Sequence, residues 1–238
     1  AVTSRDATSF TIDSMQVDDT GLLLDSIGSD GLQISDVTGS GIDRLIVGTN
    51  MADVTLDNIV VSGSGASGWM VAAENSGTLM LRNSTLTGFD AGLRMTGSGT
   101  HVLESTSISA SGTTFDISGL GRLESYSSLF STTTELGYLS GIDSQWITSS
   151  LSGDSSSNGL ELIDGKHTFV SSSISRSYLY ADSSSVGLGV TWGDVEANGL
   201  TLTGWSDGIQ CRTECLIDGS SLTAELGGVQ AGNGISID

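Results

Sequence analysis

Short runs of alternating apolar and polar residues follow one another along almost the whole chain. Apolar pairs at alternate positions include Val54 with Leu56 and Leu79 with Leu81. Gly, Ser, Asn and Asp bound these runs, and no window keeps a helical spacing for long. Alternation with a period of two, broken by turn-forming residues, is typical of β-strands. The pattern therefore predicts many short strands and no helix.

The strands belong to a repeat. The octets LTGFDAGL at 86–93 and LTGWSDGI at 202–209 share Leu, Thr, Gly, an aromatic residue, a second Gly and an aliphatic residue. Aliphatic residues in similar settings recur every 20 to 28 residues and serve as anchors: Val17, Val37, Val61, Leu86, Ile108, Leu129, Leu151, Ile174, Leu202 and Leu222. Such a period is typical of a solenoid, whose stacked coils bury a common core. We expect one all-β domain of about ten coils over residues 1–238.

Three units resemble the right-handed parallel β-helix superfamily, the pectate-lyase-like fold: TLMLRNSTLTGFDAGLRM, HVLESTSISASGTTFDI and NGLTLTGWSDGIQC. The resemblance covers the chain from Ala7 to Asp238 and implies that strands of neighbouring coils pair in parallel. It also implies that Asn58 and Asn83 point inward and bond the corner backbone. Enzymes, adhesins and phage spikes share this repeat, so it implies no single function.

Glycine follows several anchors by two residues. A glycine there allows a positive φ or a tight bend, so we expect coil corners at these positions. They are Gly39, Gly63, Gly88, Gly153 and Gly204.

The charge balance narrows the range of partners. The chain has 28 acidic and 8 basic residues, a net charge of -20, 33 glycines and no proline. Phosphate contacts need clustered Lys and Arg, so the sequence argues against nucleic acid and anionic lipid as partners. Calcium is the hard cation that stacked carboxylates would bind, but neither an EF-hand loop nor the GGxGxD series is present. Calcium stays open, and no other cofactor is expected.

The same features bear on localisation. No apolar stretch is long enough to span a bilayer. The chain opens at Ala1 without a methionine, as expected after removal of a signal peptide or after trimming of a longer chain. Its acidity and its serine richness favour export. We expect secretion or display at the cell surface.

Cys211 and Cys215 are the two cysteines of the chain. They do not complete a four-ligand zinc site, since His101 and His167 lie in other repeats. In an oxidising compartment we expect a disulfide that closes a small corner loop. The alternative is two buried thiols on neighbouring strands.

Aromatic residues are the candidates for sugar contacts. Phe89 and Trp205 stand three residues after their anchors, and we expect them to project from coil corners. The longest step, from Ile174 to Leu202, predicts a protruding loop at 178–186. Because binding residues concentrate on loops, this loop, with Tyr178 and Tyr180, is the expected place for a polysaccharide site.

The sequence contains no recognisable catalytic motif. Arg82, Asp90 and Arg94 share one coil and come nearest to a lyase site, which needs a positive charge and a base, but no neighbouring coil completes it. We therefore expect no catalytic residues.

Neither end of the repeat has a recognisable cap. Either the chain is a piece of a longer β-helix, or its open strand edges pair with a second copy. We expect the second, end-to-end self-association. The expected function is a structural subunit of a filament, shaft or coat. A carbohydrate-active enzyme, a lyase or hydrolase, or a polysaccharide-binding adhesin or spike is the alternative.

Overall fold

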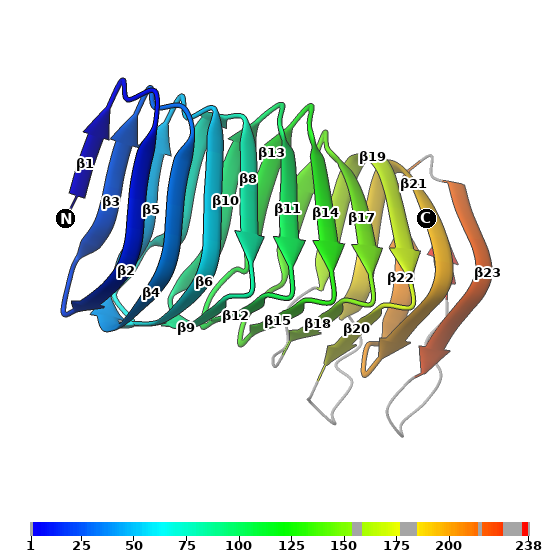
Figure 1. Cartoon of the computed structure of the whole chain (residues 1–238). Helices are drawn as coiled ribbons and strands as arrows, with labels where there is room; N and C mark the ends of the chain where they lie inside the picture. Colours follow the sequence, from blue (N-terminus) through cyan, green and yellow to red (C-terminus); the bar gives the residue numbers. More distant parts are fainter. Residues whose placement is uncertain (1, 154–158, 177–184, 214–215, 226–234, 238) are drawn as a thin grey trace.

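The chain folds into one parallel β-solenoid. A computed structural model describes residues 2–153, 159–176, 185–213, 216–225 and 235–237. The solenoid has about nine turns, close to the ten expected, and 74% of the chain is strand with no helix among the described residues. The coils stack along one axis from β1 at one end to β23 at the other (Figure 1).

Each coil runs through three faces, which we name A, B and C in chain order. Face A contains β1 (Val2–Arg5), β3 (Leu22–Ile27), β5 (Arg44–Thr49), β7 (Trp69–Ser76), β10 (Ala91–Gly97), β13 (Phe115–Gly119), β16 (Gly137–Ser140), β22 (Asp207–Cys211) and β24 (Ile235–Ile237). Face B contains β8 (Thr78–Arg82), β11 (Thr100–Glu104), β14 (Arg122–Tyr126) and β17 (Asp143–Ile147). Face C contains β9 (Thr85–Phe89), β12 (Ser107–Ala110), β15 (Leu129–Thr132), β18 (Ser150–Gly153) and β20 (Ser173–Arg176).

Six longer strands bend around a corner and serve more than one face. Strands β2, β4, β6 and β23 continue from face B into face C, β19 continues from A into B, and β21 passes through all three. Their bounds are β2 (Phe10–Asp18), β4 (Leu32–Ile42), β6 (Asp53–Gly63), β19 (Leu160–Val170), β21 (Val186–Thr203) and β23 (Leu216–Glu225).

Parallel pairing stacks each residue on its equivalent in the next coil, about 4.8 Å away. Inward positions therefore form columns that run the length of the solenoid. The face C column is Val17, Gly39, Val61, Leu86, Ile108, Phe130, Leu151, Ile174 and Leu202. Aromatic side chains from the three faces meet in the middle of the core, where the rings of Phe115 and Phe130 lie 4.9 Å apart.

The structure corrects three of the ten anchors. Val37 lies two residues before the position in the face C column, which Gly39 occupies. Leu129 is 57% exposed, and the next residue, Phe130, fills the core in its place. Leu222 pairs with Leu200 and so lies two residues early as well. Apolar residues one or two places from the true register made the sequence pattern ambiguous there.

The corner between faces B and C is built alike in nine successive coils. One residue there adopts a positive φ, between 47° and 79°, and reverses the side-chain alternation: Ser14, Asp36, Asn58, Asn83, Ser105, Ser127, Thr148, Ser171 and Gly199. Asn58 and Asn83 are exposed, and their Nδ2 atoms donate to carboxylates of the preceding coil, Asp36 at 2.5 Å and Asp57 at 2.9 Å. The inward asparagines implied by the resemblance are therefore wrong, because short polar side chains occupy this corner to tolerate its left-handed backbone.

Hydroxyl groups, not amides, form the inward polar ladder beside this corner. The ladder consists of Ser84, Thr106, Ser128, Ser149 and Ser172, each no more than 3% exposed. The Oγ of Ser128 donates to the carbonyl of Tyr126 at 2.9 Å and accepts the N–H of Thr106 at 3.2 Å. Since a hydroxyl both donates and accepts, it satisfies two buried backbone groups at once.

We predict that Ser128→Ala lowers the free energy of unfolding by about 1 to 3 kcal/mol, because the buried N–H of Thr106 loses its partner. Ser131→Ala, on the outer side of face C, should change it by less than about 0.5 kcal/mol. Urea unfolding followed by circular dichroism measures both values. Equal losses for the two variants would contradict a structural role for the ladder.

Candidate functional site

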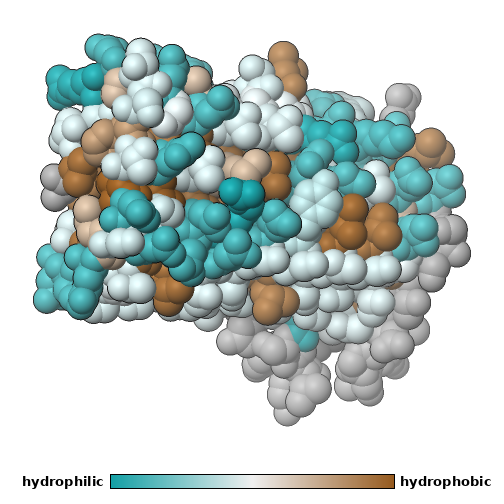
Figure 2. All heavy atoms as spheres, in the orientation of Figure 1, coloured by the Kyte–Doolittle hydropathy of each residue, from teal (hydrophilic) through white to brown (hydrophobic). Residues whose placement is uncertain are grey.

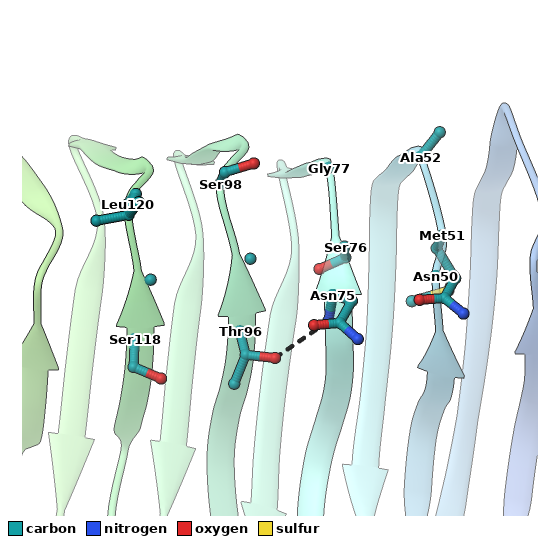
Figure 3. A pocket seen from close by; sticks show the side chains of 12 residues that line it. Asn50, Met51, Ala52, Asn75, Ser76, Gly77, Thr96, Ser98, Ser118 and Leu120 are labelled. Carbon is teal, nitrogen blue, oxygen red and sulfur yellow. Dashed lines mark hydrogen bonds between the residues drawn. The ribbon is translucent and has the colours of Figure 1, made fainter.

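A groove of about 650 Å³ follows the corner between faces A and B across four successive coils (Figure 3). Residues 50–52, 75–77, 96–98 and 118–120 line it, one segment from each coil. These segments contain amide, hydroxyl and apolar side chains and no charged residue. The groove is therefore an uncharged hollow on a strongly acidic protein.

Backbone forms the floor of this groove because glycines stack there. A Cβ added at Gly77 would overlap the carbonyl oxygen of Ala52, and one at Gly97 would overlap that of Ser76. Gly97 and Gly119 have φ values of 149° and 143°, which strain any other residue. The hollow is thus a consequence of close approach between coils, and a side chain at these positions would disrupt the stack.

Polar side chains form the walls of the groove. Asn50 and Asn75 are exposed at positive φ, and the backbone N–H of Asn75 donates to Oγ1 of Thr96 at 3.1 Å (Figure 3). Ser76 is 4% exposed, and its Oγ has no hydrogen-bond partner among the described residues. Leu120 is 89% exposed beside these groups.

Face A carries two carboxyl groups with a raised pKa, Asp116 and Glu161. Burial raises the pKa of Asp116 and of Glu161, against the effect of a neighbouring arginine in each case. The carboxylate of Asp116 forms an ion pair with Arg94 at 3.2 Å, and that of Glu161 forms one with Arg212 at 2.7 Å. Tyr138 stacks between the two acids in the same register. Both carboxylates are therefore already engaged by cations.

A glycine makes room for the ion pair between Glu161 and Arg212. Gly189 lies in register between Glu161 and Gln210, one coil before Arg212. A Cβ on Gly189 would lie 2.6 Å from Oε1 of Glu161. The missing side chain leaves room for Glu161 and lets Arg212 reach it across a full coil.

Hydroxyls cover the outer side of face C, a feature that the sequence reasoning missed. Ser109, Ser131, Ser152, Ser175 and Thr203 stack in register over five coils. A second column beside them is Thr85, Ser107, Leu129, Ser150, Ser173 and Thr201. The signal was present in the sequence as Ser or Thr on each side of an apolar anchor. Face C is therefore an uncharged surface over these coils.

The predicted aromatic sugar contacts are wrong for two of the four residues. Phe89 and Trp205 are each 2% exposed and belong to the core. The indole N–H of Trp205 donates to the carbonyl of Ile174 at 3.1 Å, which satisfies its polar atom inside the solenoid. Tyr178 and Tyr180, with the expected loop up to residue 184, lie outside the described residues. Ser185 is buried and Val186 begins β21, so the last two positions of the expected loop belong to the solenoid.

The five glycines chosen from the sequence occupy different settings. Gly88 and Gly204 have positive φ values of 71° and 80°. Gly39, Gly63 and Gly153 do not, and a Cβ at Gly39 would overlap the carbonyl oxygen of Val17 in the coil before it. At that position glycine serves close packing between coils instead of a turn.

The arginines of the lyase hypothesis lie on different faces. Arg82 is on face B and pairs with Asp57 at 3.6 Å, while Arg94 is on face A. The carboxylate of Asp90 accepts the N–H of Gly68 at 3.3 Å. The coil therefore separates these groups and does not assemble them into one site.

Cys211 ends β22 and is 3% exposed, and the described part of the chain has no free cysteine. Cys215 lies outside the described residues, so the disulfide stays a prediction. Within the described ranges, no group of three His, Cys, Asp or Glu side chains is placed to hold a metal ion.

Asn83-Ser84-Thr85 matches the acceptor pattern for N-linked glycosylation, which the sequence reasoning also missed. Asn83 is exposed at the corner between faces B and C. The site is thus accessible wherever the chain meets the modifying machinery.

Both histidines are buried inside face B. Nδ1 of His101 accepts the N–H of Leu79 at 3.3 Å. His167 contacts the hydroxyl of Ser144 at 2.8 Å and the carbonyl of Asp164 at 3.1 Å, so its ring nitrogens have partners suited to the neutral form. Burial lowers the pKa of each histidine to about 4.

Comparisons with family models, curated proteins and solved structures find no match to this chain. Among the residues that the structure describes, no helix is long and apolar enough to cross a membrane.

We predict that stability falls as the pH drops from 7 toward 5.5. The pKa of His101 and His167 is about 4 in the folded state against an ordinary 6.5, so the unfolded state binds more protons in this window. Asp116 and Glu161, with raised pKa, act in the opposite direction and at lower pH.

Urea midpoints at pH 7 and 5.5 measure the effect. His101→Leu, which matches Leu123 in the same column, should remove about half of the pH dependence. If the urea midpoint of His101→Leu depends on pH as strongly as that of the unchanged protein, the pH dependence does not come from the buried histidines.

Proposed function

We propose that this chain is a structural β-solenoid of a secreted or cell-surface assembly and carries no catalytic centre. The observation that supports the proposal is that both histidines and the two carboxyl groups of raised pKa are engaged in hydrogen bonds or ion pairs within the solenoid. His101 and His167 are hydrogen-bonded in the interior. Asp116 and Glu161 are ion-paired with arginines. None of these four is left as a free acid or base.

The surface of the solenoid suits an assembly role. About nine turns at about 4.8 Å give a rod roughly 40 Å long. The view with face B toward the reader mixes hydrophilic and hydrophobic side chains and shows no continuous apolar patch (Figure 2). Face C offers hydroxyls without charge over the coils from Thr85 to Thr203. Its columns provide a side on which a chain of charge -20 can approach a neighbour with little repulsion.

The proposal includes end-to-end association through the first coil. Strand β1 pairs with β3 alone and β2 pairs with β4 alone, so each has one open edge among the described residues. Phe10, Met15 and Val17 are only partly buried against the core there. A strand edge with apolar neighbours is a template for a further coil, which we assign to a second copy.

We predict that particles lengthen as salt rises. The charge of -20 opposes association at low ionic strength, and screening shortens the range of that repulsion. Light scattering and electron microscopy across a salt series measure the length.

Thr11→Glu on the open edge should shift assembly to higher salt, while Thr55→Glu, two coils inside in the same column, adds equal charge as the control. Single rods at every salt concentration would contradict the proposal of association.

A carbohydrate-active enzyme is the second candidate, and the pair of carboxyl groups on face A is the observation that favours it. Asp116 and Glu161 lie two coils apart, which sets their backbones about 9.6 Å apart. Carboxyl groups of inverting glycosidases are about 6.5 to 9.5 Å apart. The ion pairs with Arg94 and Arg212 weigh against this role.

We predict that the protein releases neither reducing ends nor unsaturated sugars from neutral or acidic polysaccharides. Reducing-sugar and ultraviolet assays measure both kinds of product. Release that Glu161→Gln abolishes and Glu135→Gln preserves would establish the enzyme and refute the structural proposal.

A further inference from the structure

We propose that the groove between faces A and B binds a short stretch of a neutral glycan. This inference goes beyond the structural role, because it gives the rod a specific ligand site. The groove crosses four coils, so it is roughly 14 Å long at about 4.8 Å per coil. The hollow has a volume of about 650 Å³ and is wide open to solvent, so it suits a chain of rings lying along the surface better than an enclosed small molecule.

The chemistry of the walls matches sugar hydroxyls. Asn50 and Asn75 offer amide groups that donate and accept, and Thr96, Ser98 and Ser118 offer hydroxyls (Figure 3). Each sugar hydroxyl likewise donates once and accepts twice, so both sides of the interface can be satisfied. No charged side chain competes for these positions.

Leu120 completes the site with an apolar contact. It is 89% exposed at the rim of an otherwise polar groove. The C–H faces of a sugar ring are apolar, and burying them against this side chain is favourable.

The charge and the backbone select the ligand class. A net charge of -20 repels uronate and sulfate polymers, so the glycan is neutral. An added peptide strand would need a free sheet edge. The groove instead runs across stacked coils whose strands pair with both neighbours, such as β10 with β7 and β13.

The test is calorimetric titration of the whole chain with cellohexaose, mannohexaose and laminarihexaose, and with oligogalacturonate as the acidic probe. We expect binding of at least one neutral hexasaccharide. Leu120→Ala and Asn75→Gly should each weaken it about fivefold, the loss expected for one contact. Glycine keeps the positive φ of Asn75, so the fold is retained. Leu129→Ala is the matched control, since Leu129 is also exposed but lies on face C.

Three outcomes would overturn the inference: no binding of any neutral probe, binding of the acidic probe alone, or equal affinity in Leu120→Ala, Asn75→Gly and the control. Thermal melting of each variant separates lost contacts from lost folding. Cleavage of a bound hexasaccharide would refute the non-catalytic function, and the two groove variants would still decide whether the groove is the binding site.

Discussion

In-register parallel pairing between coils is the constraint on which the rest of this structure depends. Each residue stacks on its equivalent about 4.8 Å away, so each side chain must fit the residues above and below it in the column as well as the residues of its own coil. Phe115, for example, stacks on Gly137, where a Cβ would overlap the carbonyl oxygen of Phe115. Phe115, Phe130 and Trp146 then fill the cross-section from three faces, with ring centroids 4.9 to 5.9 Å apart.

The same constraint decides where polar groups enter the core. Ser144 stacks on His167, and its hydroxyl contacts that imidazole at 2.8 Å while it accepts the indole N–H of Trp146 at 2.9 Å. The hydroxyl ladder repeats this solution at the B–C corner. The Oγ of Ser149 accepts the N–H of Ser128 from the preceding coil at 3.5 Å and donates to the carbonyl of Ile147 in its own coil at 3.1 Å. A polar side chain is tolerated inside because the adjacent coil supplies its partner.

The sequence predicted the strands, the repeat and the solenoid, because period-two alternation and a regular return of apolar residues record stacking directly. It failed where neighbouring residues were equally suitable, as at Leu129 and Phe130, of which only the second is buried. It also failed at Asn83, since the position of a residue in the coil does not tell which way a left-handed corner turns its side chain. The groove could not be predicted from the sequence, because it arises from close contacts of glycines between coils, such as Gly77 against Ala52.

Variation in coil length is not spread evenly around the solenoid. In nine successive coils the B–C corner keeps one residue of positive φ, although these corners lie 21 to 28 residues apart. The connection 64–68 between β6 and β7, one of the longer ones that the structure describes, falls on the passage from face C to face A. Segments inserted there leave the register of all three faces unchanged. New loops can therefore be inserted at that edge by evolution or by a protein engineer, whereas the B–C corner keeps a constant geometry that sets the register of the coils.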